Sequence, residues 1–328
     1  LPLDAPAAPV RLVISTAKDK TEHCPIHVNM HGGGFVFPQD HDDDLYCAHL
    51  AAEIHGIVVD IDYATSWDHP FPCAFEQGYA VVRWVFEQCE SWGGDPGRIS
   101  VGGHSAGGCL SAAISMGAAA TKDFDLCLQI LDYSALDNYQ AVLPGYNERS
   151  NAFSKLYADG DDRVLQLPFC SPLFATDEML KGLPRTLVIN AEKCPFKQDN
   201  EKYALRMAAM GNEVTIKCFA DSPHGFTVRL AGQWQQAQEL IIRTIKEAQA
   251  EKERTRTARQ ELTDFKQQVE NLEKAALEEK IARKMEKLRE KQERKKDKKA
   301  KQANAPETPV APKVRPIEAG DYVRIKGQ

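Results

Sequence analysis

The pentapeptide Gly103-His104-Ser105-Ala106-Gly107 constrains this 328-residue chain more than any other stretch. Apolar and β-branched residues at 99–101 predict a strand before it, and small residues at 109–116 predict a helix after it. A serine on a sharp turn between strand and helix is pushed out of the sheet, and glycines are needed where neighbouring backbone passes close by. The context therefore predicts that Ser105 is a nucleophile.

Two further motifs suit the same chemistry. His31-Gly32-Gly33-Gly34 closes an apolar run, and consecutive glycines let backbone N–H groups point at one small volume, as a developing oxyanion requires. The alternative is a flexible turn between strand and helix. His224 lies in a loop after the strand-like run 214–219 and follows Ser105 in chain order, which fits the base of a hydrolase triad. A lone histidine is otherwise more often a satisfied surface or core residue.

Strand-like runs alternate with helical stretches along the first 240 residues. That alternation predicts an α/β fold with a mainly parallel sheet and helices on both faces. Catalytic loops then gather at the carboxyl ends of the strands. An irregular insertion is expected at about 135–175. The predicted strands are 10–16, 26–30, 56–62, 99–103, 126–131, 186–190 and 214–219.

Residues from about 10 to 240 resemble the hormone-sensitive-lipase branch of the α/β-hydrolases, a family of esterases and lipases. The resemblance rests on motifs in family order: HGGGF at 31–35, DYATSWDHPFPCA at 62–74, GGDPGRISVGGHSAGG at 93–108, LPRTLVINAE at 183–192 and HGF at 224–226. It implies the α/β-hydrolase fold and a covalent acyl-enzyme.

The resemblance also implies residue roles. Ser105 would be the nucleophile and His224 the general base, and the N–H groups of Gly33, Gly34 and Ala106 would form the oxyanion hole. The insertion at 135–175 would contribute to a small cap. The chain begins almost at its first strand without an initiator Met, so we expect an incomplete N-terminus and an open pocket that favours short acyl groups.

One departure from the family pattern concerns the triad acid. Relatives carry an aspartate where this chain has Cys194, and a neutral thiol is a poor acceptor that cannot stabilise imidazolium by charge. Glu192 and Asp199 are possible replacement acids. The alternatives are that Glu192 is a residue that the family often has at this position, and that Asp199 lies on the solvated face of the next helix. His104 stands where many relatives have Asp or Glu, and we assign it no chemistry.

Charge and cysteine content divide the chain near residue 246. Residues 1–246 hold 19 Lys and Arg against 31 Asp and Glu, while residues 247–328 hold 22 against 16. The nine cysteines all precede residue 219 and include no C-x-x-C pair. They predict buried thiols in a reducing compartment rather than disulfides or a metal site. No apolar run of about 18 residues is present, so we expect no membrane span and a cytoplasmic location, with no metal and no cofactor.

The second part is typical of a long charged helix or coiled coil over 247–302, because strong helix formers dominate it. A Pro-rich linker at 303–317 and the start of a truncated β-domain at 318–328 are expected to follow. This tail resembles the helical segment of bacterial MutS-like ATPases that carry an Smr domain, in stretches such as IEAGDYVRIKGQ. No Walker A motif is present, so ATPase activity is not carried over, and we expect a fusion or mis-joined frame near 238–248.

Three functions follow as hypotheses. The first is a serine carboxylesterase acting on short-chain acyl esters. The second is a catalytically weak or inactive hydrolase-fold protein that binds a small ligand, which Cys194 favours. The third is nucleic-acid binding through the basic run at 291–301, which the acidic first part opposes. The oligomeric state is left open.

Overall fold

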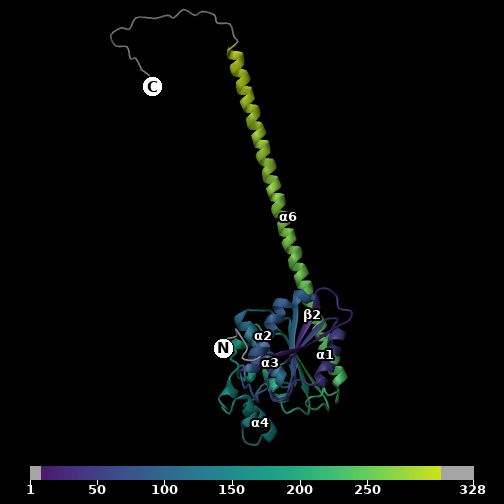
Figure 1. Ribbon diagram of the computed structural model, residues 1–328. Coiled ribbons are helices and arrows are strands. Elements are labelled where there is room, and N and C mark those ends of the chain that lie inside the picture. The colour runs from purple at the N-terminus through teal and green to yellow at the C-terminus, as the bar shows by residue number, and fades with distance from the viewer. Residues whose placement is uncertain (1–8, 304–328) are drawn as a thin grey trace, which may run out of the picture. The chain divides into compact units, whose positions relative to one another are not determined.

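A computed structural model describes residues 9–303 and contains a seven-stranded sheet (Figure 1). The strand order is β1-β3-β2-β4-β5-β6-β7, in which β1 is antiparallel to β3 and every other pair is parallel. Each predicted strand overlaps an observed one, so the predicted α/β fold with a mainly parallel sheet is confirmed. The strands are Arg11–Thr16 (β1), Cys24–Met30 (β2), Ile57–Asp62 (β3), Gly94–His104 (β4), Leu128–Asp132 (β5), Arg185–Ala191 (β6) and Val214–Phe219 (β7).

Helices cover both faces of the sheet, which explains why its central strands are buried on both sides. The side chains of β2 are buried along its whole length. On one face lie α2 (Cys73–Gln88), α3 (Ala106–Thr121) and α5 (Lys197–Ala209). On the other face lie α1 (His41–Ile54) and the first turns of α6 (Trp234–Ala303).

The expected insertion at 135–175 is not wholly irregular. It contains α4 (Glu148–Tyr157), whose first turn is capped by the side chain of Asn147, which accepts a hydrogen bond from the Ser150 N–H. Short 3₁₀ turns make up most of its remaining regular structure. The chain's 3₁₀ turns are Cys89–Trp92 (η1), Gln140–Val142 (η2), Val164–Gln166 (η3), Pro172–Phe174 (η4) and Glu178–Leu180 (η5).

The helix α6 begins at Trp234, earlier than the predicted start at 247. Its first turns belong to the hydrophobic core, because Ala237, Ile241 and Ile245 are fully buried there. The chain separates into two compact units, residues 1–258 and 259–328. The predicted boundary at 246/247 therefore falls inside α6 and stays a prediction.

Within the second unit, α6 exposes a series of large apolar side chains. A coiled coil over this stretch stays a prediction. The Pro-rich linker from 304 on and the predicted β-domain start at 318–328 lie outside the described residues. The exposed apolar residues are Leu262, Phe265, Val269, Leu272, Leu277, Ile281, Met285 and Leu288.

Candidate active site

Ser105 lies at the junction between β4 and α3, on a strained backbone. Its φ of 55° and ψ of −116° are sparsely populated for a non-glycine residue, a strain of about 1–3 kcal/mol. The turn is held because the Ser105 N–H donates to the carbonyl of Asp132 at 2.9 Å. A Cβ on Gly107 would collide with the Met30 carbonyl, so the backbone approaches too closely there for any other residue.

His224, in the loop after β7, faces Ser105. Its Nε2 is 3.0 Å from the Oγ of Ser105. The rings of Tyr133 and Phe196 pack edge-on against the imidazole, with centroid distances of 4.9 Å and 5.3 Å. These contacts restrict the ring to an orientation in which Nε2 points at the serine.

The electrostatic surroundings keep His224 neutral. Burial comes first and the positive charges of His104, Arg229 and Arg149 follow, and together they lower the pKa of His224 to about 4. An imidazole with this pKa is unprotonated at pH 7, which is the state that a general base needs.

Cys194, after β6, occupies the other side of the imidazole. Its Sγ is 3.1 Å from Nδ1 of His224. Burial raises the pKa of Cys194 to about 12, so the group is a neutral thiol. A carboxylate only accepts hydrogen bonds, so it keeps the proton of the imidazole on Nδ1 and leaves Nε2 free to take a proton from serine. A thiol is both a weak donor and a weak acceptor, so it fixes neither tautomer of the imidazole.

The two possible replacement acids have other partners. Asp199, in the first turn of α5, forms an ion pair with Lys202 at 3.1 Å. An oxygen of Glu192 accepts the Asp221 N–H at 2.8 Å. Among the described residues, neither carboxylate hydrogen-bonds His224, because that ring uses Nδ1 for Cys194 and Nε2 for the serine.

The three predicted oxyanion donors have free N–H groups. Within the described part of the chain, none of the N–H groups of Gly33, Gly34 and Ala106 donates to a protein acceptor. Ala106 is the first residue of α3, where N–H groups have no partner inside the helix. The φ values of 111° at Gly33 and 63° at Gly34 turn the loop into a conformation that favours glycine. The loop of Gly33 and Gly34 follows β2, which pairs with β4 as far as Met30 and Gly103, so these donors and the N–H of Ala106 come from the same edge of the sheet. Free donors from two such loops are what a tetrahedral oxyanion requires.

His104 has a partner that the motif did not indicate. Its Nε2 is 2.9 Å from Oδ1 of Asp43 in the first turn of α1, and both residues are buried. Burial pulls the pKa of His104 down, but the contact with Asp43 outweighs burial and raises it overall. The same nitrogen is 2.9 Å from the N–H of Gly32, so this pair lies directly beneath the oxyanion loop.

Asp132, at the end of β5, connects the loops of the nucleophile and the base. Its carbonyl accepts the Ser105 N–H, and its carboxyl accepts the Oγ1 of Thr227 at 2.5 Å. Burial raises the pKa of Asp132 to about 7. The position of Asp132 between these two loops could not be predicted from the sequence, because no motif includes this residue.

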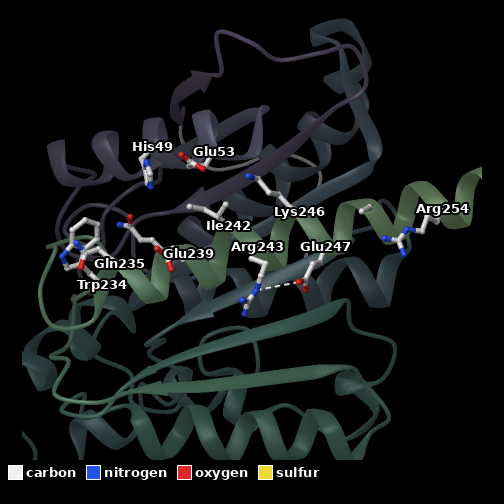
Figure 2. A pocket seen from close by; sticks show the side chains of 12 residues that line it. His49, Glu53, Trp234, Gln235, Glu239, Ile242, Arg243, Lys246, Glu247 and Arg254 are labelled. Carbon is white, nitrogen blue, oxygen red and sulfur yellow. Dashed lines mark ion pairs between the residues drawn. The ribbon is translucent and has the colours of Figure 1, made fainter.

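A separate surface groove lies between α1 and the start of α6, with a volume of about 760 Å³ (Figure 2). His49 and Glu53 project into it from α1, and α6 supplies most of the remaining side chains. These carry charges of both signs, including the ion pair of Arg243 with Glu247 at 3.7 Å. The groove contains none of the predicted catalytic residues.

Residues 9–303 contain neither a metal-binding cluster nor a membrane-spanning helix. No group of three or more His, Cys, Asp or Glu side chains in that range is arranged to hold a metal ion. Among the same residues, no helix is both long and apolar enough to cross a membrane.

Comparison with known proteins gives one consistent family. The model of a family described as having the alpha/beta hydrolase fold matches residues 27–228. Esterase LipI of Mycobacterium tuberculosis is 32% identical over 239 residues, which cover 69% of this chain and 73% of LipI. Carboxylesterase NlhH of the same species is 31% identical and covers 62% of this chain and 67% of its own length.

A solved structure agrees with these relatives. Carboxyl esterase 2 from the fungus Tuber melanosporum superposes with a TM-score of 0.65 at 28% identity, covering 73% of this chain and 82% of that one. The family model ends at residue 228, and none of these comparisons supports the predicted likeness of the tail to MutS-like ATPases.

Proposed function

The chain belongs to the α/β-hydrolase family and is a carboxylesterase-type hydrolase; from that premise we propose that it cleaves short-chain acyl esters with Ser105 as nucleophile and His224 as base. The observation that carries the proposal is the 3.0 Å contact between His224 Nε2 and Ser105 Oγ beside unpaired N–H groups. A nucleophile in contact with its base, facing free donors, is the arrangement that acyl transfer needs.

The reaction proceeds in two halves. Oγ of Ser105 forms a bond to the ester carbonyl carbon while its proton passes to Nε2 of His224. The N–H groups of Gly33, Gly34 and Ala106 hold the negative oxygen of the tetrahedral intermediate. His224 then returns the proton to the departing alcohol oxygen as its bond to carbon breaks, which leaves an acyl-serine. Water repeats the sequence and releases the acid.

The weak point of this mechanism is the imidazolium that forms between the two proton transfers. Cys194 offers it a neutral sulfur rather than a carboxylate, and Glu192 and Asp199 have other partners. A second candidate function is therefore a hydrolase-fold protein that binds an ester-like ligand and turns it over slowly. Cys194 is the observation that favours it.

One assay separates these functions. Initial rates of p-nitrophenyl acetate hydrolysis are compared for the full chain, Ser105→Ala and Cys194→Asp. Turnover by the full chain that Ser105→Ala abolishes supports the esterase. Slow turnover that Cys194→Asp restores favours the binding protein. Turnover that Ser105→Ala leaves unchanged refutes the proposed nucleophile.

A reducing cellular compartment, such as the cytoplasm, is part of the proposal. All nine cysteines are free thiols, and eight of them are buried. Free thiols persist where glutathione and thioredoxin keep them reduced. Localisation of a tagged chain by fractionation tests this part independently of activity.

A further inference from the structure

Arg149 approaches the oxyanion loop from α4. Its guanidinium carbon lies 5.2 Å from the centre of the Phe153 ring and 5.9 Å from that of Phe37. The ring of Phe153 lies against Gly34, where any side chain would collide with it. Arg149 is therefore one aromatic ring away from a proposed oxyanion donor.

Arg229 approaches from the other side, in the loop of the general base. Its Cδ lies 3.4 Å from the position that a Cβ on Gly225 would occupy. Gly225 directly follows His224, and the Arg229 N–H donates to the Gly225 carbonyl at 3.0 Å. The two arginines thus approach from different segments, one beside the oxyanion loop and one beside the residue after His224, and the positive charge of each acts on His224.

Neither arginine has an acidic partner in the described part of the chain, and both are exposed. Other arginines of the same unit are paired: Arg163 contacts Asp161 at 2.7 Å, and Arg206 contacts Asp177 at 2.8 Å. The unpaired arginines stand out further because residues 1–246 have 31 acidic side chains against 19 basic ones.

We propose that Arg149 and Arg229 bind a carboxylate of the substrate, so that the preferred substrates are esters that also carry a carboxylate, such as half-esters of dicarboxylic acids. The proposal rests on the esterase function above and adds its substrate class. A guanidinium that lies over aromatic rings keeps its N–H donors in its own plane, where they can meet both oxygens of a carboxylate. A neutral ester would make no use of these two positive charges.

The test uses matched pairs of esters and the full chain. Mono-p-nitrophenyl adipate differs from p-nitrophenyl hexanoate by a carboxylate in place of the terminal methyl group. 4-Acetoxybenzoate and 4-methylphenyl acetate place the same difference on the alcohol side. The quantity measured is the kcat/KM of the anionic ester divided by that of its neutral partner.

We expect the full chain to favour the anionic ester in one of the pairs. Arg149→Gln and Arg229→Gln should each lower that ratio by about tenfold, as expected for an exposed charge-assisted contact. Added salt should lower it too, since exposed charges are screened. Lys155→Gln, which removes a positive charge from the same helix, serves as the control and should leave the ratio unchanged.

Three outcomes decide the matter. Equal ratios in the full chain and both arginine variants, with activity that depends on Ser105, overturn this inference and leave the esterase function standing. An equal fall in the Lys155→Gln control also overturns it, since general charge would then explain the preference. If no ester is turned over, the esterase function fails, and the carboxylate site is then tested by calorimetric titration with adipate. Saturable binding that both arginine variants weaken supports the site. Absence of binding refutes it.

Discussion

At the scale of single residues, the site differs from a Ser-His-Asp triad in that a thiol stands in place of the carboxylate. Cys194 keeps contact with Nδ1 of His224 but supplies no charge. The imidazole is therefore neutral and ready as a base, yet its protonated form is poorly stabilised. With its pKa lowered to about 4, His224 is unprotonated at pH 7 but is a weak base.

Cys194→Asp should stabilise the protonated imidazole. The new carboxylate should raise kcat for p-nitrophenyl acetate by up to about 10⁴-fold, the loss seen when a serine protease loses this charge. It should also raise the pKa of His224 from about 4 towards the ordinary range of histidine, because an opposite charge favours the imidazolium.

The pH profile of kcat/KM measures this directly. The full chain should keep its activity down to about pH 4 and lose it only below that, because His224 protonates there. In Cys194→Asp the loss should begin at higher pH. An unchanged profile would contradict the assignment of the Cys194 contact to the acid position.

The buried pair of Asp43 and His104 predicts a stability effect. Asp43→Asn should destabilise the fold by about 3–5 kcal/mol, because it leaves a buried charge without its partner. The pKa of His104 is raised, so the stabilisation is complete below its unfolded value of 6.5 and is lost as pH rises through the folded value. The difference between wild type and Asp43→Asn should therefore shrink at high pH.

Urea unfolding at several pH values provides the measurement. Asp42→Asn is the matched control, since Asp42 lies in the same turn of α1 but is exposed. It should change stability by less than about 0.5 kcal/mol. Equal effects of both substitutions would show that the contact with His104 adds nothing beyond an acidic charge in the first turn of α1.

At the scale of elements, α6 has two different roles along its length. Its first turns cover one face of the sheet, with Ala237, Ile241 and Ile245 in the core, while from Leu262 on its apolar side chains are exposed. Truncation after residue 258 should leave the esterase activity intact, because that position ends the first compact unit.

Truncation after residue 233 should instead prevent folding, since it uncovers the core face formed by β5 and β6. Ile241→Ala or Ile245→Ala in the full chain should cost about 2–5 kcal/mol each, as for other large-to-small core changes. Thermal unfolding with Leu262→Ala as an exposed control gives the comparison. A full effect from Leu262→Ala would mean that the exposed stretch is covered in solution.

The strands and the nucleophile turn were predictable from sequence because their information is local. The strands are short runs rich in apolar and β-branched residues, and the glycines around Ser105 mark a close approach of backbone. The start of α6 was missed because charge composition, which placed the boundary near 246, does not report burial. The helix α4 was missed inside a segment with weak periodicity.

The contacts between distant residues were less accessible. The resemblance indicated Ser105, His224 and Cys194, and the structure brings these three side chains together. Asp43 reads as an ordinary acidic residue in a helix's first turn, and only the fold places it against His104. Arg149 and Arg229 belong to segments 80 residues apart in the sequence, so no local pattern links them.

At the scale of the whole molecule, buried histidines and buried aspartates have opposite effects on how stability depends on pH. Burial lowers the pKa of His27 to about 3 and, with nearby positive charges, that of His224 to about 4. Burial also raises the pKa of Asp60 and of Asp132 to about 7. Between pH 4 and 6.5, His27 and His224 are protonated only in the unfolded chain, whereas Asp60 and Asp132 are protonated only in the folded chain. Each state therefore binds two protons on these four groups. These contributions cancel, so these groups leave the free energy of unfolding nearly independent of pH in that window.

Replacing one of these groups should make the free energy of unfolding depend on pH in this window. In His27→Gln the folded chain binds one proton more than the unfolded chain, so stability should rise by about 1.4 kcal/mol per unit as pH falls from 6.5 to 4. Asp60→Asn should give the opposite slope. Urea midpoints across this range measure both, and parallel slopes in the two variants would contradict the balance.

The oxyanion donors that we propose for this protein are all main-chain groups, and that has an evolutionary consequence. A point mutation can erase a triad member in one step, but the N–H groups of Gly33, Gly34 and Ala106 survive most changes of side chain. A lineage that loses the triad acid therefore still has a binding site for carbonyl oxygens. Drift away from hydrolysis would lead such a chain towards becoming a receptor for the compounds its ancestors cleaved.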